Sequence, residues 1–516
     1  LVRVHWFAFI VHSTRFHRRP VGLALSARAA AGGGGGYSRR HMQTQLFIGG
    51  QWRTSSTDST FDVFDPATGE LIVAVASASA DDAEAACGAA HIAQQQWAAV
   101  APREKAEILR RCFEIMHEHS DELARLIVRE SGKPLADAIG EVGYAAEFFR
   151  WNSEEAVRIR GSIGTAPSGN NQIIVRHPPV GVVVIVTPWN FPAAMITRKL
   201  APALAAGNAV VIKPPAETPL TALRLAELFA EAGIPDGVIN VTPTADAGTW
   251  FDAAVEHRAT RMVSFTGSTA TGQKLLRRCA DRVLKVVMEL GGNAPFIVFD
   301  DADIDAAVAG AITAKMRHSA QTCTAANRFF VQAGVVEEFT TKFAAAMRAV
   351  PIGPGLSAGV ECGPLIHEAA VDKVEGLVEA AVVAGAKIEA GGHRLDRPGS
   401  FFEPTVLSNV AFDSPITREE IFGPVAPIIT FTDIDEMIDH ANDTEMGLIG
   451  YVFTRDLALG LNVSERLQAG MIALNRGAIS DPAAPFGGMK QSGLGREGAS
   501  DGIYEFCETQ YIGVAY

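Results

Sequence analysis

The chain has 516 residues and a formal net charge of −13, with 48% hydrophobic and 20% charged residues. Its length exceeds what one hydrophobic core usually supports, so it predicts two or three domains of an ordinary soluble globular protein. The acidic balance argues against a nucleic-acid partner, and no apolar run reaches the ~20 residues that a membrane helix needs.

The first 41 residues differ from the rest of the chain. They are rich in arginine, and no acidic residue appears before Asp58. A basic, acid-free N-terminus can be a transit peptide for an organelle such as the mitochondrion. We favour the alternative, a disordered or non-native extension on a cytoplasmic protein, because a glycine run at 32–36 and Met42 precede patterned sequence. The six cysteines fit neither a disulfide framework nor paired zinc ligands, which predicts a reducing compartment and no metal.

The N-terminal third begins with short strands and then becomes helical. Residues 46–52 predict a hairpin that turns at Gly49-Gly50, and residues 80–159 have the spacing of long amphipathic helices. Residues 161–179, which are rich in Gly, Ser, Asn and Pro, break this pattern. They predict an extended hairpin that leaves the body of the domain.

Apolar β-branched runs then alternate with helical stretches. The expected strands are 180–186, 209–212, 238–241, 261–265 and 283–288, and the expected helices between them include 192–206 and 219–232. This alternation is typical of a parallel sheet with crossover helices. New strands and helices follow residue 292, so we predict an α/β fold with two such domains. Residues 503–514 are predicted to be extended and to pair with the 161–179 hairpin or with another subunit.

Cys323 lies between small and polar residues, with no second cysteine close enough in sequence to make a metal site or a CxxC pair. An isolated cysteine is more often a packing residue than a nucleophile. Other short stretches bear on the choice. Asn190 follows a buried strand, where ligands of parallel sheets bind, and its amide could donate to an oxyanion or cap the next helix.

Two further stretches also lie at strand ends, and a third lies at the predicted boundary between the domains. Gly267 and Ser268 lie where a strand gives way to a helix, whose first amides suit a pyrophosphate, although the motif is not GxGxxG. Lys213 ends another strand and could reach ribose or phosphate oxygens. Glu289, beside a glycine pair, could take a proton from water or from the thiol.

Taken together, these stretches resemble the aldehyde dehydrogenase superfamily from about Leu46 to Tyr511. The motifs occur in the family's order, and Glu289 precedes Cys323 by the family's 34 residues. Further matches are Gly207-Asn208, Lys199, and residues 485–488 running into 493–497. The resemblance implies a Rossmann-like cofactor domain of residues 42–160 and 181–291, a catalytic domain of residues 292–490, and an oligomerisation element of residues 161–180 and 491–516.

The resemblance also implies a mechanism. Cys323 adds to the aldehyde carbonyl, Asn190 and the Cys323 amide stabilise the oxyanion, and hydride transfer to NAD(P) leaves a thioester. Glu289 then activates a water, and Lys199 and Glu497 help to relay the proton outward. The residues implied to bind the cofactor are Thr187, Pro188, Trp189, Lys213, Ala216, Gly267, Ser268, Leu290, Gly291, Glu420 and Phe422.

Within the superfamily, the resemblance is strongest to succinate-semialdehyde dehydrogenases. It rests on residues 193–199, on Arg317 and on Ile479-Ser480. It implies that Arg198, Arg317 and Ser480 hold the distal carboxylate of the substrate, since arginine forks bind carboxylates bidentately. Each arginine could instead form a structural ion pair, and glutarate semialdehyde could use the same clamp. A non-catalytic family member is disfavoured because the thiol, the glutamate and the asparagine are all present.

Two departures from relatives matter. Some relatives carry a second cysteine two residues after the nucleophile, and here Ala325 predicts that this redox switch is absent. NAD-preferring relatives often carry a glutamate where this chain has Ala216, which favours NADP over NAD. Glu217 could still reach the ribose and restore a preference for NAD. We further expect a homodimer or homotetramer.

Overall fold

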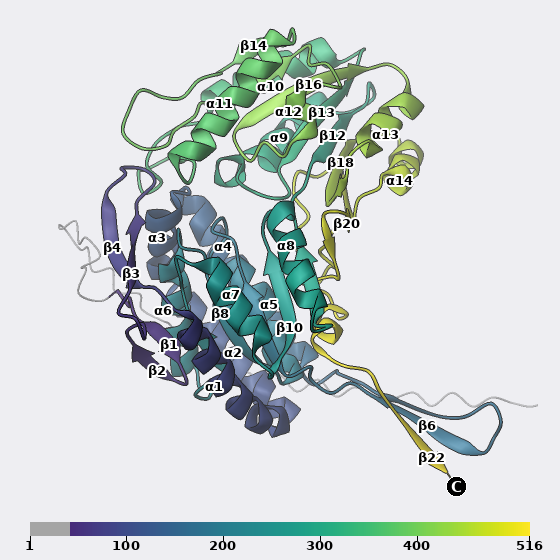
Figure 1. Cartoon of the computed structure of the whole chain (residues 1–516). Coiled ribbons are helices and arrows are strands. Elements are labelled where there is room, and N and C mark those ends of the chain that lie inside the picture. The colour runs from purple at the N-terminus through teal and green to yellow at the C-terminus, as the bar shows by residue number, and fades with distance from the viewer. Residues whose placement is uncertain (1–41, 516) are drawn as a thin grey trace, which may run out of the picture. The chain divides into compact units, whose positions relative to one another are not determined.

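The computed structural model describes residues 42–515, so the predictions for residues 1–41 lie outside the described residues (Figure 1). Two large sheets dominate the described part of the chain. The larger has eight strands in the order β2-β1-β9-β8-β7-β10-β11-β21. These are β1 (Leu46–Ile48), β2 (Gln51–Arg53), β7 (Val182–Val186), β8 (Ala209–Lys213), β9 (Ile239–Val241), β10 (Thr260–Thr266), β11 (Lys285–Glu289) and β21 (Gly493–Leu494).

Helices cover both faces of this sheet, which explains why its central strands are apolar throughout. In β7, Val183 and Ile185 belong to the core on one face of the sheet, whereas Val182 and Val184 belong to the core on the other face. The helices are α1 (Ala80–Ala99), α2 (Pro102–Glu118), α3 (Ser120–Ser131), α4 (Leu135–Glu155), α5 (Ala194–Ala206), α6 (Pro219–Glu231), α7 (Ala247–Glu256) and α8 (Thr269–Ala280). β7 to β11 run parallel, as continuous apolar strands predict.

The second sheet has seven strands in the order β14-β15-β16-β13-β12-β18-β19, and only β14 is antiparallel to its neighbour. Its strands are β12 (Ala294–Val298), β13 (Ala326–Gln332), β14 (Lys387–Ala390), β15 (Thr405–Ser408), β16 (Val425–Phe431), β18 (Ile449–Phe453) and β19 (Met471–Leu474). Its helices are α9 (Ile304–Met316), α10 (Val336–Ala349), α11 (Glu368–Val383), α12 (Pro415–Arg418), α13 (Ile434–Asn442) and α14 (Leu457–Arg466). The predicted α/β class is confirmed.

A third sheet, in the order β22-β6-β5, forms an arm that projects from the larger sheet's side of the structure (Figure 1). It contains β5 (Ser162–Thr165), β6 (Asn171–Arg176) and β22 (Gln510–Ala515), and the predicted pairing of the hairpin with the C-terminal strand is present. Two small sheets, β3 (Thr60–Phe64) with β4 (Leu71–Ala76) and β17 (Met446–Gly447) with β20 (Met489–Lys490), complete the strands.

The C-terminal segment differs from the prediction in two places. Residues 502–506 form a short 3₁₀ helix rather than a strand, because Ile503 and Phe506 are three residues apart and are buried in the same core as α5. The proposed oligomerisation element of residues 491–516 is also not one piece, since β21 pairs with β11 in the larger sheet. Among residues 42–515, no helix is long and apolar enough to cross a membrane.

Candidate active site

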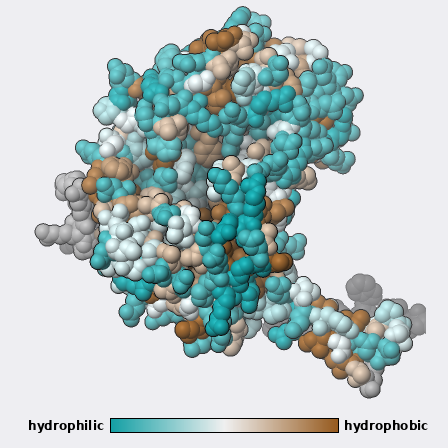
Figure 2. Space-filling view, in the orientation of Figure 1, coloured by the Kyte–Doolittle hydropathy of each residue, from teal (hydrophilic) through white to brown (hydrophobic). Residues whose placement is uncertain are grey.

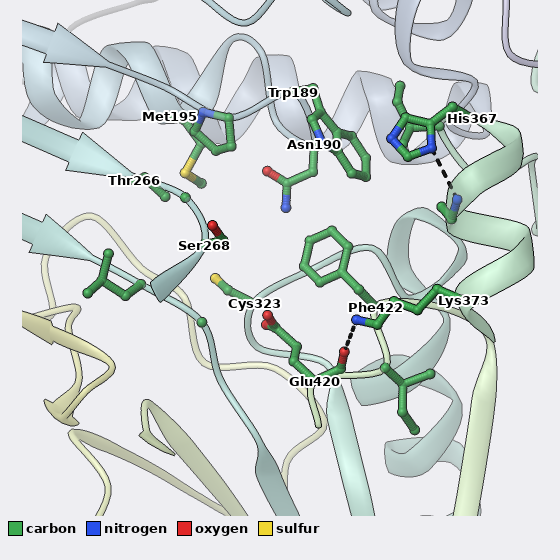
Figure 3. Close-up of a pocket in the computed structure, with 17 residues that line it drawn as sticks. Trp189, Asn190, Met195, Thr266, Ser268, Cys323, His367, Lys373, Glu420 and Phe422 are labelled. Carbon is green, nitrogen blue, oxygen red and sulfur yellow. Dashed lines mark hydrogen bonds between the residues drawn. The ribbon is translucent and has the colours of Figure 1, made fainter. Parts of the chain in front are cut away.

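Cys323 faces a cavity of about 410 Å³, called here the thiol cavity (Figure 3). Loops at the carboxyl ends of β7, β10 and β11 form one wall of the cavity. Cys323, residues 366–373 and residues 420–422, which belong to the part of the chain that carries the second sheet, form the other wall. The lining includes Pro188, Trp189, Asn190, Thr266, Gly267, Ser268, Leu290, Gly291, Cys323, His367, Lys373, Glu420 and Phe422. In Figure 3 the Cys323 sulfur and the Glu420 carboxylate lie across the cavity from Asn190, with the Phe422 ring beside them.

The backbone of Cys323 is held close to the glycine pair that follows β11. A Cβ on Gly292 would lie 2.4 Å from the carbonyl oxygen of Cys323, so only glycine allows this approach. Burial raises the pKa of the Cys323 thiol to about 12, although Arg198 and Arg317 act to lower it. The resting thiol is therefore protonated at neutral pH, and it needs a base before it can act as a nucleophile.

Asn190 links the two walls of the cavity. Its Nδ2 donates to the carbonyl oxygen of Gln321 at 2.8 Å, and its Oδ1 is buried without a hydrogen-bond partner. An amide nitrogen carries two hydrogens, so one remains available to an oxyanion. The Asn190 side chain is thus anchored to Gln321, which precedes Cys323 by two residues in the sequence, and one N–H of its amide stays free to donate.

Glu289 is the last residue of β11 and is 2% exposed. It does not line the thiol cavity, and neither of its carboxylate oxygens has a hydrogen-bond partner. Burial and the nearby Glu497 raise the pKa of Glu289 well above its usual value. A carboxyl group that makes no hydrogen bonds and has a raised pKa is suited to act as a general base near neutral pH.

Glu497 forms a buried ionic cluster with two neighbouring cations of α5. It pairs with Lys199, and its second oxygen lies 2.7 Å from Nη2 of Arg198. Burial acts to raise the pKa of Glu497, but Lys199 and Arg198 outweigh this effect and lower it. The surroundings therefore shift the pKa values of the two carboxyl groups in opposite directions, with that of Glu289 raised and that of Glu497 lowered.

Most residues predicted to bind the cofactor line the thiol cavity. Three do not: Thr187 is buried, Lys213 Nζ donates to the carbonyl oxygen of Pro214 at 3.1 Å, and Ala216 lines a neighbouring cavity of about 220 Å³. Ile366 and His367 line both cavities, so the two adjoin. Burial lowers the pKa of Lys213 to about 8.

The thiol cavity has features that fit a nicotinamide dinucleotide. Thr266 Oγ1 is buried in its wall without a hydrogen-bond partner. Gly267 and Ser268 lead into α8, where free backbone amides suit a phosphate group. The Glu420 carboxylate accepts from the Gly292 amide at 3.0 Å and has lone pairs left for hydroxyl groups. No group of metal-ligating side chains occurs among residues 42–515.

A second cavity, of about 300 Å³, is called here the arginine cavity. Its lining includes Asp137, Glu141, Tyr144, Phe191, Arg317, His318 and Ser480. Arg317 is half-buried and forms no ion pair with any residue in 42–515, while its guanidinium lies 5.7 Å from the centre of the Phe191 ring. The structure thus brings Arg317 and Ser480 together as predicted, with a free positive charge.

Arg198 lies elsewhere than the predicted carboxylate clamp requires. It is 2% exposed, pairs with Glu497, stacks on Phe486 at 3.8 Å from the ring centre, and does not line the arginine cavity. Its neighbour Lys199 on α5 faces the same carboxylate. This is the structural ion pair that the sequence left open as an alternative.

The sequence profile of the aldehyde dehydrogenase family matches residues 52–512. The chain belongs to this family. A succinate-semialdehyde dehydrogenase of Paenarthrobacter nicotinovorans is 52% identical over 86% of this chain and 99% of its own length. The NADP-dependent succinate-semialdehyde dehydrogenase of Escherichia coli K12 is 47% identical over 91% of this chain and 97% of its own length. The crystal structure of succinate-semialdehyde dehydrogenase from Burkholderia pseudomallei matches with a TM-score of 0.92, at 46% identity over 94% of this chain and all of that one.

The candidate site contains residues that sequence reasoning missed. Lys373 lines the thiol cavity and donates to the carbonyl oxygen of Glu420 at 2.5 Å (Figure 3). Asp137 and Glu141 line the arginine cavity. These residues belong to helices that read as ordinary amphipathic segments, so only their tertiary contacts single them out.

Proposed function

We propose that this aldehyde dehydrogenase oxidises succinate semialdehyde to succinate, with NADP as the favoured cofactor. The observation that carries the proposal is the unpaired Arg317 beside Ser480 in the arginine cavity, directly before the nucleophile loop. A charged guanidinium that is partly desolvated has a strong preference for a carboxylate. The two relatives named for this substrate, which cover nearly the whole chain, support the assignment.

The residues divide the reaction into two stages. In the first, Cys323 gives its proton to a solvent water in the thiol cavity and its sulfur adds to the aldehyde carbon. The free N–H of Asn190 and the Cys323 amide stabilise the oxyanion. The bound nicotinamide supplies a hydride acceptor, and Cys323 is left as a thioester. Trp189 and Phe422, whose rings lie 5.6 Å apart in the thiol cavity, help to exclude water from it.

In the second stage, Glu289 takes a proton from a water that attacks the thioester. The side chain must turn from its buried position toward the thiol, and the absence of hydrogen bonds to its carboxyl oxygens favours that movement. Glu497 and Lys199, next to it in the ionic cluster, can pass the proton outward. Cleavage frees the carboxylic acid and returns the thiol.

Initial rates with succinate semialdehyde, glutarate semialdehyde and propanal, each with NADP and NAD, test the proposal. We expect the highest kcat/KM with succinate semialdehyde and NADP. A higher value with propanal than with either semialdehyde would reject the carboxylate recognition, and absence of reduced cofactor with every aldehyde would reject the activity.

Replacing Arg317 with alanine should raise KM for succinate semialdehyde by about ten- to a hundredfold, because a charge-assisted hydrogen bond is worth ~1.5–3 kcal/mol. The KM for propanal should change little. Arg418→Ala, which removes an exposed arginine paired with Asp443, is the matched control. Equal effects of Arg317→Ala on both aldehydes would remove Arg317 from the substrate site.

The cofactor preference should depend on Ala216. A carboxylate introduced by Ala216→Glu would repel a 2′-phosphate and accept a hydrogen bond from a 2′-hydroxyl, so kcat/KM should fall about tenfold with NADP and hold or rise with NAD. The conservative control is Ala216→Gln, which has the same size without the charge. An unchanged NADP/NAD ratio in Ala216→Glu would place the adenosine ribose elsewhere.

The arm of β5, β6 and β22 supports an oligomer, which we propose to be a homodimer or homotetramer. Ile163, Tyr511, Ile512 and Val514 on these strands are exposed, and the arm shows hydrophobic residues on its surface (Figure 2). Such exposed apolar residues mark protein–protein contacts.

All six cysteines are unpaired, which supports a reducing compartment such as the cytoplasm.

A further inference from the structure

One face of α4 contacts both loops that carry the reacting groups. Asp137 and Glu141 lie four residues apart on the first turns of this helix, so their side chains project from the same face. Asp137 reaches the loop before Cys323, and Glu141 reaches the segment after Asn190. Neither residue takes part in the chemistry described above.

Asp137 holds the start of a strained segment. Its Oδ2 accepts the backbone N–H of His318 at 2.7 Å. His318, Ser319 and Ala320 have φ of 49°, 55° and 65°, which is the left-handed region. Each such residue other than glycine costs ~1–2 kcal/mol, and strain of this kind persists only where the surroundings hold it. The segment ends three residues before the thiol.

Glu141 holds the beginning of α5. Its Oε1 accepts the backbone N–H groups of Ala193 and Ala194 at 2.9 and 3.2 Å, and the helix has no side-chain cap of its own. Lys133 forms a fully buried ion pair with Glu141 and donates from Nζ to the carbonyl oxygen of Asn190 at 2.9 Å. Through Lys133 and Glu141, the backbone of Asn190 is linked to α4. The loop before Cys323 is linked to the same helix through Asp137.

The two loops touch each other through the hydrogen bond from Asn190 Nδ2 to Gln321, which involves the oxyanion donor itself. Stabilisation of an oxyanion depends on donors that are already in place before the reaction. We propose that Asp137 and Glu141, together with Lys133, are positioning residues that set the Cys323 thiol against the Asn190 amide. This inference rests on the proposed aldehyde oxidation.

A purely structural role is the alternative, and a buried ion pair is weak evidence for stability in either direction. The chain offers a matched control in Glu130, a buried carboxylate on α3 that accepts the N–H groups of Leu220 and Thr221 at the start of α6. Glu130→Ala removes the same kind of helix cap as Glu141→Ala, but from a helix that carries no reacting group. Because Glu130 lines the cavity of Ala216, this variant is the control for alkylation of the thiol and not for kcat.

The experiment compares Asp137→Ala, Asp137→Asn, Glu141→Ala, Glu141→Gln and Glu130→Ala in the full chain. We expect both alanine variants at 137 and 141 to lower kcat by about ten- to a hundredfold, as displacement of a reacting group by ~1 Å does, for succinate semialdehyde and propanal alike. Asp137→Asn keeps an acceptor for the His318 amide and should recover most of the loss.

Alkylation of Cys323 by iodoacetamide, located by peptide mass, gives a second measurement. Its rate should rise about threefold or more in Asp137→Ala, because the relaxed loop exposes the thiol. It should not change in Glu130→Ala.

A second substitution tests the strain directly. Glycine adopts positive φ without strain, so Ala320→Gly combined with Asp137→Ala should restore part of the lost kcat. The inference is overturned if Asp137→Ala keeps the wild-type kcat and alkylation rate, if Asp137→Asn is as impaired as Asp137→Ala, or if Ala320→Gly restores nothing. Alkylation needs no aldehyde and no cofactor, so it tests the positioning of the thiol even if the wild-type protein fails to oxidise succinate semialdehyde, an outcome that overturns the proposed function alone.

Discussion

Replacing Cys323 with alanine lowers kcat/KM for succinate semialdehyde by at least about 10³-fold, because no other group can form the covalent intermediate. Cys323 is the only cysteine lining the thiol cavity, and the other five are buried. The loss should be seen with both NADP and NAD, while binding of either cofactor, measured by fluorescence, is retained. Retained binding shows that the thiol cavity remains formed.

Cys279→Ala provides the matched control. Cys279 is buried at the end of α8 and has no part in the site, so its removal should cost stability but leave kcat within about twofold of the wild type, as expected for a packing cysteine. A Cys323→Ala variant with more than a tenth of the wild-type rate would contradict covalent catalysis by this residue.

Replacing Glu289 with glutamine should separate the two stages of the reaction. Hydride transfer proceeds once and leaves a thioester, but without a general base the hydrolysis slows by about 10²–10³-fold. Rapid mixing should therefore show a burst of up to one reduced cofactor per subunit, followed by a slow steady state. If hydride transfer also vanishes, Glu289 takes the proton from the thiol as well.

The pH dependence follows from the raised pKa of Glu289. Burial and repulsion by Glu497 favour its protonated form, and a general base works only when deprotonated. Turnover in the wild type should therefore fall as the pH drops through a value well above the usual glutamate pKa, and Glu289→Gln should lose this limb. The variant should fold at least as stably as the wild type at neutral pH, because a neutral amide avoids the burial of a charge. Glu289→Asp, which keeps the acid on a shorter side chain, should retain the pH limb with a lower rate.

The sequence was most informative about groups that stand at strand ends. Asn190, Gly267 and Ser268 follow β7 and β10, and continuous apolar strands predict both the parallel sheet and the edge at which ligands bind. The resemblance to the aldehyde dehydrogenase superfamily, which includes the family's spacing between Glu289 and Cys323, then favoured a nucleophile over a packing cysteine. The positions of such residues can be predicted because they depend only on a strand and on the turn directly after it in the sequence.

The direction of long side chains could not be predicted in this way. Arg198 and Lys199 are adjacent on α5, yet both reach Glu497, which is about 300 residues away in sequence. Arg198 stacks on Phe486 and pairs with Glu497, and it does not line the arginine cavity. The contacts of Asp137 and Glu141 are equally remote in sequence, and their positions read as the polar side of an ordinary helix.

The left-handed run before the thiol was also not predictable. His318, Ser319 and Ala320 carry none of the glycine that normally marks positive φ, and their conformation is fixed by tertiary hydrogen bonds to Asp137 and Gly363. Sequence patterns report local preference, and here tertiary contacts override it.

The central claim is that succinate semialdehyde becomes a thioester on Cys323, and one measurement tests it most directly. Glu289→Gln is mixed with succinate semialdehyde and NADP, quenched in acid within the burst, digested and analysed by mass spectrometry. The account predicts one added succinyl group on the peptide that carries Cys323, and none when Cys323 is also replaced by alanine. A succinyl group on another residue, or a burst of NADPH with no acyl group on the protein, would contradict it.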